Sequence, residues 1–130
     1  MQWETGKNLG FSDADAGALY LPVDPAADAP TVEGQEGDPD SLLNTVRALL
    51  KLRHDEADLQ ADGELKVLCA EKGKPFVYRR GNLTLALNPS GEKQFAELEG
   101  EVSEAVFMLG KADVNGRRLA MGPQSFAVLR

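Results

Sequence analysis

The chain has 130 residues, enough for one ordinary domain with its own core, and 42% of them are hydrophobic, as in soluble globular proteins. The 21 Asp and Glu residues outnumber the 14 Lys and Arg, and the resulting net charge of −7 disfavours nucleic-acid binding, which needs a basic surface. No apolar run approaches the ~18 residues of a membrane span, and no basic start leads into an apolar stretch. We therefore expect no membrane partner, no signal peptide and a cytoplasmic location.

The negative charge is concentrated in the first third of the chain. Residues 1–40 hold nine acids against one base, Lys7, for a net charge of −8, whereas residues 41–130 hold 12 acids and 13 bases, for +1. Residues 1–37 also lack any sustained hydrophobic period. Their embedded aromatic residues argue against a free linker and predict a long irregular loop that packs on a neighbour. These aromatic residues are Trp3, Phe11 and Tyr20.

A helix is predicted next, from about Pro39 to about His54. Asp38 can cap the free N–H groups at the helix start, and Pro39 suits the first helical position. Apolar residues then recur at steps of three and four, which is typical of an amphipathic helix. These stripe residues are Leu42, Val46, Leu49 and Leu50.

From Gly63 onward the hydrophobic period changes to two, and short apolar runs alternate with Gly, Pro and Asn turn signals. Short strands at even spacing predict a mainly β fold, an antiparallel β-sandwich with hairpin and Greek-key connections. The run Leu83–Leu87 is apolar on both faces apart from Thr84, so we place it centrally. The predicted strands are Glu64–Ala70, Pro75–Arg80, Asn82–Asn88, Glu92–Leu98, Glu104–Leu109, Arg117–Met121 and Ser125–Leu129.

Familiar patterns of catalytic and metal-binding residues are missing. The single Cys69 can form neither an internal disulfide nor a Cys-based zinc site. The run Asp13-Ala14-Asp15 lacks the third acid and the distal Glu of a calcium loop, and there is neither a Gly-x-Ser-x-Gly elbow nor a phosphate loop. We predict no cofactor and no metal site.

Two aromatic residues are candidates for stacking on a sugar. Trp3 could do so, although an anchor that packs the loop on a neighbour explains it better. Tyr78 alternates with Phe76 on one predicted strand, and cross-strand packing explains this pair as well as a sugar platform does.

Four motifs resemble glycoside hydrolase family 13, in its α-glucosidase and oligo-1,6-glucosidase branch, and they occur in the order of that family. Met1-Gln2-Trp3-Glu4, followed by Gly10-Phe11, is similar to its Met-Gln-Trp-Asp…Gly-Phe segment, with Glu4 in place of the usual Asp and without the preceding Arg-Thr-Pro. Leu21-Pro22-Val23-Asp24-Pro25 looks like its Leu-Pro-Val-Asn-Pro loop. Asp38 to Asn44 resembles the last barrel helix, and Leu119 to Leu129 resembles the closing strand of the C-terminal β-domain.

The resemblance implies a place for each segment in a larger enzyme with a (β/α)₈ barrel. Residues 1–37 correspond to the eighth βα loop, residues 38–62 to the last barrel helix and its connection, and residues 63–130 to the C-terminal β-sandwich domain. The implied partner is the catalytic barrel of the same enzyme, with an oligosaccharide as an additional ligand. Because barrel active sites are built from βα loops, Gln2 and Trp3 are expected to border the sugar in the whole enzyme.

The same resemblance implies that the isolated chain is not an enzyme. Retaining glycosidases need two carboxyl groups about 5–5.5 Å apart, and the family takes them from strands in the middle of the barrel. We expect the chain to stabilise the barrel, and the whole enzyme to hydrolyse α-glucosidic bonds of small oligosaccharides. The alternative is a carbohydrate-binding module for α-glucans, which rests on the predicted sandwich alone.

Overall fold

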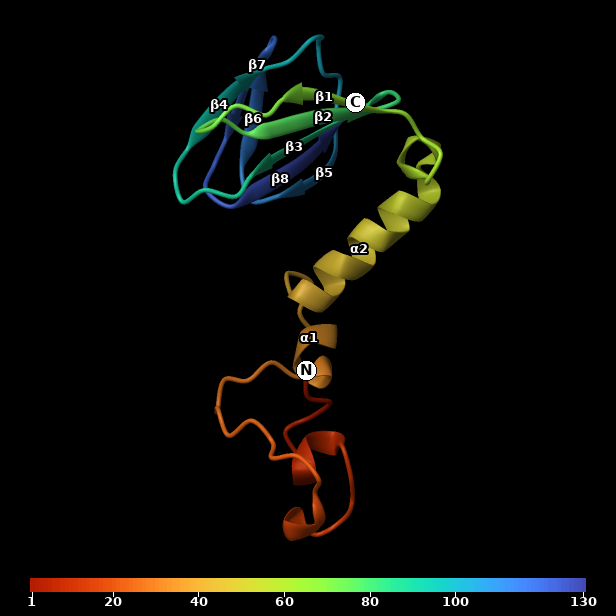
Figure 1. Cartoon of the computed structure of the whole chain (residues 1–130), viewed down its shortest axis with the longest axis vertical. Coiled ribbons are helices and arrows are strands. Elements are labelled where there is room, and N and C mark those ends of the chain that lie inside the picture. Colours follow the sequence, from red (N-terminus) through yellow and green to blue (C-terminus); the bar gives the residue numbers. More distant parts are fainter. The chain divides into compact units, whose positions relative to one another are not determined.

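The computed structural model describes residues 1–130 and divides into two compact units, Met1–Asp55 and Glu56–Arg130. The first (unit 1) consists of irregular chain and helices, and the second (unit 2) consists mainly of strands (Figure 1). None of the helices is both long enough and apolar enough to cross a lipid bilayer.

Unit 1 is largely irregular up to two α-helices, α1 (Val32–Glu36) and α2 (Leu42–Asp55). Two single 3₁₀ turns, Lys7–Gly10 and Ala16–Ala18, interrupt the irregular part. Helix α1 was not predicted, because five residues are too few to show a helical period. Its start is capped by Thr31, whose hydroxyl oxygen accepts a hydrogen bond from the backbone N–H of Gly34 at 3.0 Å.

Helix α2 begins later than the predicted Pro39. Its cap is Ser41, whose hydroxyl oxygen accepts a hydrogen bond from the backbone N–H of Asn44 at 3.2 Å. Asp38 instead accepts from the backbone N–H of Asp40 at 2.9 Å, which forms a turn ahead of the helix. The predicted capping by Asp38 was therefore wrong, because its carboxylate is used in the turn.

The apolar stripe of α2 lies uncovered within the structure. Leu42 is 72% exposed, Val46 is 44% exposed and Leu50 is 60% exposed. No residue of the helix is buried. An amphipathic helix normally gains its stability from packing this stripe on a partner.

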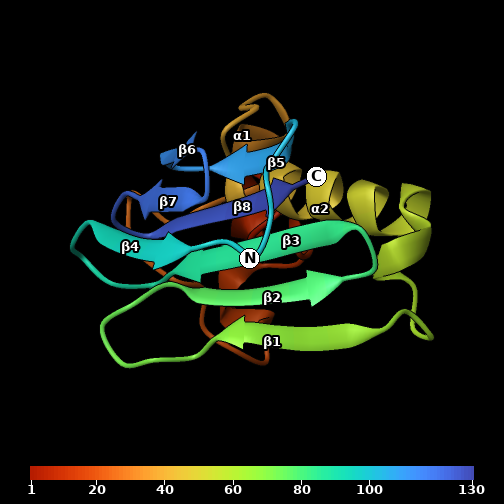
Figure 2. The ribbon, with the colours of Figure 1, turned by 90° about the horizontal axis from the view of Figure 1, so that it is seen from above.

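Unit 2 is a sandwich of two antiparallel sheets, which confirms the predicted fold class. The larger sheet has the strand order β1-β2-β3-β8-β5 and the smaller has the order β4-β7-β6 (Figure 2). The strands are β1 (Leu65–Cys69), β2 (Phe76–Arg80), β3 (Leu83–Asn88), β4 (Gln94–Glu97), β5 (Ala105–Leu109), β6 (Ala112–Asn115), β7 (Arg118–Met121) and β8 (Ser125–Leu129). Each predicted strand is present and β3 is central, but β6 was missed.

The core lies between the two sheets. Apolar side chains from both sheets are buried there. At one end of the core the polar Asn88 and Ser125 are also buried, and each donates a hydrogen bond to the carbonyl of Gly122 at 2.7 Å. The buried core residues are Val77, Ala86, Ala96, Leu98, Leu119, Met121, Ala127 and Leu129. Both edge strands of the larger sheet carry an irregular register, β1 between Val67 and Cys69 and β5 between Ala105 and Phe107.

The larger sheet is also apolar on the side that faces away from this core. We call this side the outer face; its residues share one side of the sheet by strand register and alternation. All of them are apolar except Tyr78 and Arg80. They are Leu65, Val67, Phe76, Tyr78, Arg80, Leu83, Leu85, Leu87, Phe107, Leu109, Phe126 and Val128.

The segment that precedes β1 is fastened to one corner of unit 2. The side chain of Arg130 forms an ion pair with Glu56 at 2.6 Å. The carboxylate of Asp58 accepts a hydrogen bond from the backbone N–H of Asn82 at 2.9 Å, at the turn between β2 and β3. These contacts hold residues 56–63, here called the connector, against the strands.

Replacing Gly81 with alanine is expected to destabilise this turn. Its φ of +52° is unfavourable for any side chain, and an added Cβ would collide with the Asp58 carboxylate. Gly116 has a similar φ of +58° with nothing within 4 Å, so it is a matched control. We expect Gly116→Ala to cost about 1–2 kcal/mol of unfolding free energy and Gly81→Ala about 1 kcal/mol more, because the Asp58 hydrogen bond is also lost. Urea unfolding followed by the amide resonances of β3 measures both, and equal losses would contradict the clash.

Tyr78 gives a prediction for alkaline pH. Burial raises the pKa of the Tyr78 phenol, so the folded state favours the neutral form. This contribution to stability is complete below the ordinary phenol pKa of about 10 and is lost as pH rises through the folded-state value. In a Tyr20→Phe variant, which leaves one phenol, ultraviolet absorbance should show ionisation above pH ~10. A midpoint at or below the ordinary value would show that the ring is solvated.

Candidate functional site

The backbone of the first three residues completes the start of helix α1. Gln2 pairs with Thr31 in a parallel β-bridge. The carbonyl of Gln2 accepts a hydrogen bond from the N–H of Val32 at 2.8 Å, and that of Trp3 accepts from the N–H of Glu33 at 3.0 Å. Amides in the first turn of a helix have no partner within the helix. The segment therefore satisfies two of them, and this fixes Gln2 and Trp3 relative to α1.

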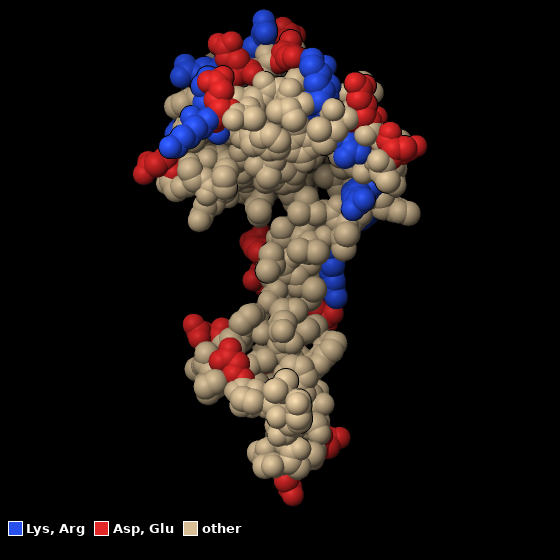
Figure 3. All heavy atoms as spheres, viewed as in Figure 1, with Lys and Arg blue, Asp and Glu red and all other residues tan.

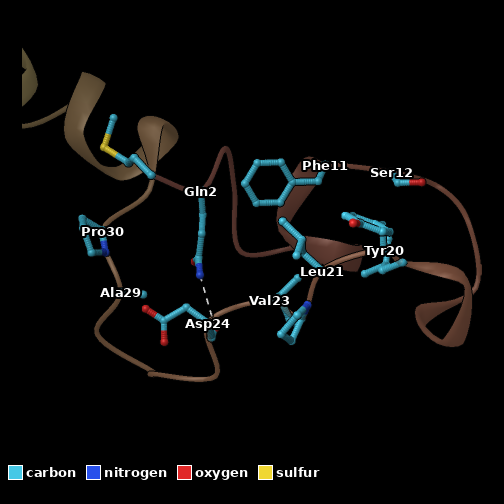
Figure 4. A pocket seen from close by; sticks show the side chains of 12 residues that line it. Gln2, Phe11, Ser12, Tyr20, Leu21, Val23, Asp24, Ala29 and Pro30 are labelled. Carbon is cyan, nitrogen blue, oxygen red and sulfur yellow. Dashed lines mark hydrogen bonds between the residues drawn. The ribbon is translucent and has the colours of Figure 1, made fainter.

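The side chain of Gln2 is turned into unit 1. Gln2 is only 8% exposed, and its Nε2 atom donates a hydrogen bond to the backbone carbonyl of Asp24 at 3.2 Å (Figure 4). The residue thus joins the start of the chain to the loop at Asp24. Its amide group therefore already has a hydrogen-bond partner within the protein.

Trp3 lies on the opposite side of the segment and is 56% exposed. Its backbone N–H donates to the carbonyl of Leu9 at 3.1 Å. Next to it, Gly10 has a φ of +76°, and a Cβ there would lie 2.8 Å from the Cβ of Trp3. Only glycine allows the backbone to come this close to Trp3. The backbone at Gly10 therefore packs directly against the Cβ end of the Trp3 side chain.

A hollow of about 640 Å³ opens beside Gln2, and we call it the apolar hollow. Figure 4 shows the side chains around it, with the Phe11 and Leu21 side chains facing the Gln2 amide across it. Tyr20 lies at its rim and is 97% exposed. A concave, mostly apolar surface with one buried amide is typical of a place that receives a ligand or a partner.

A second hollow, of about 610 Å³, lies beside Trp3, and we call it the acidic hollow. Its charged residues are mostly acids, and two of its charged groups already have partners. Lys7 donates to the carbonyl of Asp13 at 2.6 Å, and Glu36 forms an ion pair with Arg47 at 2.9 Å. Its charged lining residues are Glu4, Lys7, Asp13, Glu33 and Glu36.

The acidic hollow combines an exposed indole with carboxylates. Such a pair can meet the apolar face and the hydroxyl groups of a sugar ring. The structure contains no group of three or more His, Cys, Asp or Glu side chains placed to hold a metal ion.

The structure does not bring the predicted site residues together. Gln2 and Trp3 are neighbours, but one is buried against Asp24 and the other faces the acidic hollow. Tyr78 lies in unit 2, with its ring centroid 5.4 Å from that of Phe76. Phe11 lines both hollows of unit 1 and was not predicted as a site residue. The available signal was that Phe11 is one of the few aromatic residues in the irregular segment.

Comparison with known proteins places these features in a family, although no family model matches the chain. The chain is 44% identical over 82 residues to the protein named probable oligo-1,6-glucosidase 2 of Bacillus subtilis, a match that covers 63% of the chain. It is 30% identical to trehalose synthase of Thermus thermophilus over 145 residues, covering 98% of the chain. The chain spans 14% of the length of the first relative and 15% of the second.

Solved structures show the same fold. Isomaltulose synthase of Erwinia rhapontici matches 98% of the chain with a TM-score of 0.83 at 22% identity, and the match covers 24% of that enzyme. Trehalulose synthase of Pseudomonas mesoacidophila matches equally well, with a TM-score of 0.83 at 20% identity. The solved structures agree in fold, and the sequence matches show that the chain belongs to glycoside hydrolase family 13, as a C-terminal region of its α-glucosidase-type enzymes.

Proposed function

We propose that this chain is a non-catalytic region that stabilises the catalytic barrel of an α-glucosidase-type glycoside hydrolase. The proposal rests chiefly on the apolar surface that each unit leaves uncovered. This surface is the stripe of α2 in unit 1 and, in unit 2, the edges of the outer face, where Leu65, Val67 and Leu109 are exposed. Apolar surface of this extent marks a place where another protein surface packs. Full burial of a Leu, Val or Phe side chain contributes about 1.5–3 kcal/mol, so a barrel packed here would gain substantial stability.

The proposal assigns a role to each segment of the chain. Residues 1–37 serve as the eighth βα loop of the barrel, residues 38–62 as its last helix and connection, and residues 63–130 as the C-terminal domain. The whole enzyme hydrolyses α-glucosidic bonds of small oligosaccharides, as the name of the Bacillus subtilis relative suggests.

Gln2 and Trp3 border the substrate in this proposal, but they have different roles. The exposed Trp3 ring at the acidic hollow is the group that can contact a sugar. Gln2 acts as a positioning residue, because its amide group is bonded to Asp24 and its backbone to α1.

One observation favours a second candidate, a carbohydrate-binding module for α-glucans. An exposed indole beside carboxylates can bind a sugar without any barrel. The two candidates differ in whether the isolated chain binds sugar at all.

The first test is turnover by the isolated chain. With isomaltose, maltose or sucrose as substrate, we expect no release of glucose above the blank, because the paired carboxyl groups of a glycosidase come from the barrel. Glucose release that is lost in a Glu33→Gln variant would overturn the non-catalytic assignment. Glu33 lies in the acidic hollow and is therefore the carboxylate to substitute first.

The second test is an amide and indole NMR titration of the chain with maltotriose and with isomaltose. We expect well-dispersed resonances that do not respond to either sugar, since the rest of the proposed sugar site would belong to the barrel. Saturable shifts at Trp3 that disappear in a Trp3→Ala variant would establish the binding module instead. Shifts lost in Tyr78→Ala would place that site on unit 2.

A further inference from the structure

We propose that Asn115 is a site of spontaneous deamidation, and that the carboxylate formed there joins a row of charged side chains on the three-stranded sheet. Deamidation here is independent of the proposed function, because only the hairpin of β6 and β7 and its neighbours take part. The site stands out when the surroundings of the five asparagines of the chain are compared.

The hairpin leaves the reacting groups of Asn115 free. Asn115 is exposed at the end of β6. Gly116 is the first of the two turn residues, and its φ of +58° suits a type II′ turn. Neither the side chain of Asn115 nor the N–H of Gly116 has a hydrogen-bond partner. Because Gly116 has no side chain, its nitrogen can reach the side-chain carbonyl carbon of Asn115 without steric hindrance.

Two other asparagines are followed by a residue that blocks this attack. Asn88 is only 2% exposed and precedes Pro89, which has no N–H to lose. Asn82 is exposed, but it precedes Leu83, whose branched side chain is fully buried. The N–H of Asn82 itself is also bonded to the carboxylate of Asp58. Neither position offers the freedom of the hairpin turn.

The remaining two asparagines have side-chain amides that are held by the backbone. The Nδ2 atom of Asn8 donates a hydrogen bond to the carbonyl of Ser12 at 2.8 Å. The Nδ2 atom of Asn44 donates to the carbonyl of Gln35 at 2.9 Å. Attack on either side chain would first have to break these bonds. Asn115 is therefore the asparagine most open to reaction.

The proposed reaction consumes one water and releases one ammonia. The backbone nitrogen of Gly116 loses its proton to hydroxide and bonds to the Cγ atom of Asn115, and the bond from Cγ to the side-chain nitrogen breaks. The product is a five-membered succinimide ring. Water then opens either ring C–N bond, which gives aspartate or, with the main chain rerouted through the side chain, isoaspartate. No oxidant or reductant is needed.

The fold slows this reaction without preventing it. Asn115 must rotate out of its strand conformation before Gly116 can attack, and its pairing with Arg118 must open. It is the last residue of β6, which is an edge strand of only four residues. Strand ends of this kind open locally at a small cost in free energy. We therefore expect a rate below that of an unfolded peptide but far above that of the other asparagines.

The side of the three-stranded sheet that faces away from the core already carries charges beside Asn115. Strand register places Arg118 of β7 between Glu97 of β4 and Asn115 of β6, and we call these three residues the charged row. The guanidinium of Arg118 also lies 4.7 Å from the ring centroid of Phe95. In Figure 3 charged side chains of both signs gather along the upper edge of unit 2, where Figure 1 labels β7.

The two products act on this row differently. Aspartate at position 115 gives Arg118 a second acidic cross-strand neighbour, so the guanidinium is drawn away from Phe95. Isoaspartate lengthens the main chain before Gly116, so the pairing of position 115 with Arg118 is lost. Val114, which precedes it, packs against the core. The isoaspartyl form is therefore expected to loosen β6.

Ageing of the chain in mildly alkaline buffer, followed by tryptic digestion and mass spectrometry, tests the site. Cleavage after Lys111 and Arg117 isolates Asn115 in the peptide 112–117, whereas the other asparagines lie in the peptides 8–47 and 81–93. An unaged sample gives the background. We expect residues 112–117 to gain the mass of an amide-to-acid change at least about ten-fold faster than any other asparagine, since only this turn opens easily.

A synthetic peptide with the sequence of residues 112–117 and an Asn115→Gln variant complete this test. Persistence of the unmodified form in the folded chain, while the free peptide is converted, would show that the hairpin protects Asn115 and would overturn the inference. Isoelectric focusing should show a new acidic form of the aged chain that is absent from aged Asn115→Gln. An equal amount of that form in Asn115→Gln would also overturn it, because the charge would then arise elsewhere.

A comparison of Asn115→Asp with Asn115→Gln tests the consequence for the charged row. We expect the aromatic ring resonances of Phe95 to shift in Asn115→Asp and to stay in place in Asn115→Gln, since only the carboxylate attracts Arg118. Added salt should reduce the shift, because exposed charges are screened. Identical Phe95 resonances in the two variants would show that the new carboxylate does not join the row.

Discussion

The architecture of unit 2 depends on a five-stranded sheet that is hydrophobic on both sides. Strand β3 is apolar on both sides, since its residues from Leu83 to Leu87 alternate between the outer face and the core between the sheets. Such a sheet must be covered twice. The three-stranded sheet provides one cover and buries Leu119 and Met121 against it. The connector provides only a corner of the other, so Leu65, Val67 and Leu109 stay exposed toward the edges of the outer face.

Unit 1 is organised differently. Hydrogen bonds between side chains and the backbone, rather than a buried apolar core, hold its chain in place. Gln2 holds the loop at Asp24, and Thr31 and Ser41 cap the two helices. Asn44 adds hydrogen bonds to the carbonyls of Gln35, Glu36 and Asp38. An arrangement of this kind fixes the local path of the chain but buries little apolar surface. Its stripe and its hollows are therefore left uncovered, and the proposed barrel would cover them.

The strands could be predicted from the sequence because their signals are local. Alternation and turn residues located every strand of the larger sheet, and the two-sided apolar pattern of Leu83–Leu87 identified its centre. Strand β6 escaped prediction because four residues, two of them the polar Asp113 and Asn115, look like a turn until β7 pairs with them. The start of α2 shifted because Asp38 satisfies its own turn, a competition that residue type alone does not reveal.

The candidate site was less predictable. The family motif directed attention to Gln2 and Trp3 as a pair, yet the two side chains leave the backbone on opposite sides. Whether the amide of Gln2 is available to a sugar depends on Asp24, which is 22 positions away and which no local pattern connects to it. The same holds for Phe11, whose place between two hollows follows from the path of the loop.

The irregular register at both edges of the larger sheet has a consequence for the chain on its own. An uncovered apolar sheet with straight edges invites further strands to add to it, and this is the usual route to fibrils. In β1 the break falls between Val67 and Cys69, and in β5 it falls between Ala105 and Phe107, so neither edge offers a continuous row of free backbone groups. The apolar outer face is thus separate from the edges at which strands could be added. Two molecules can therefore associate through their outer faces without extending each other's sheets into a fibril.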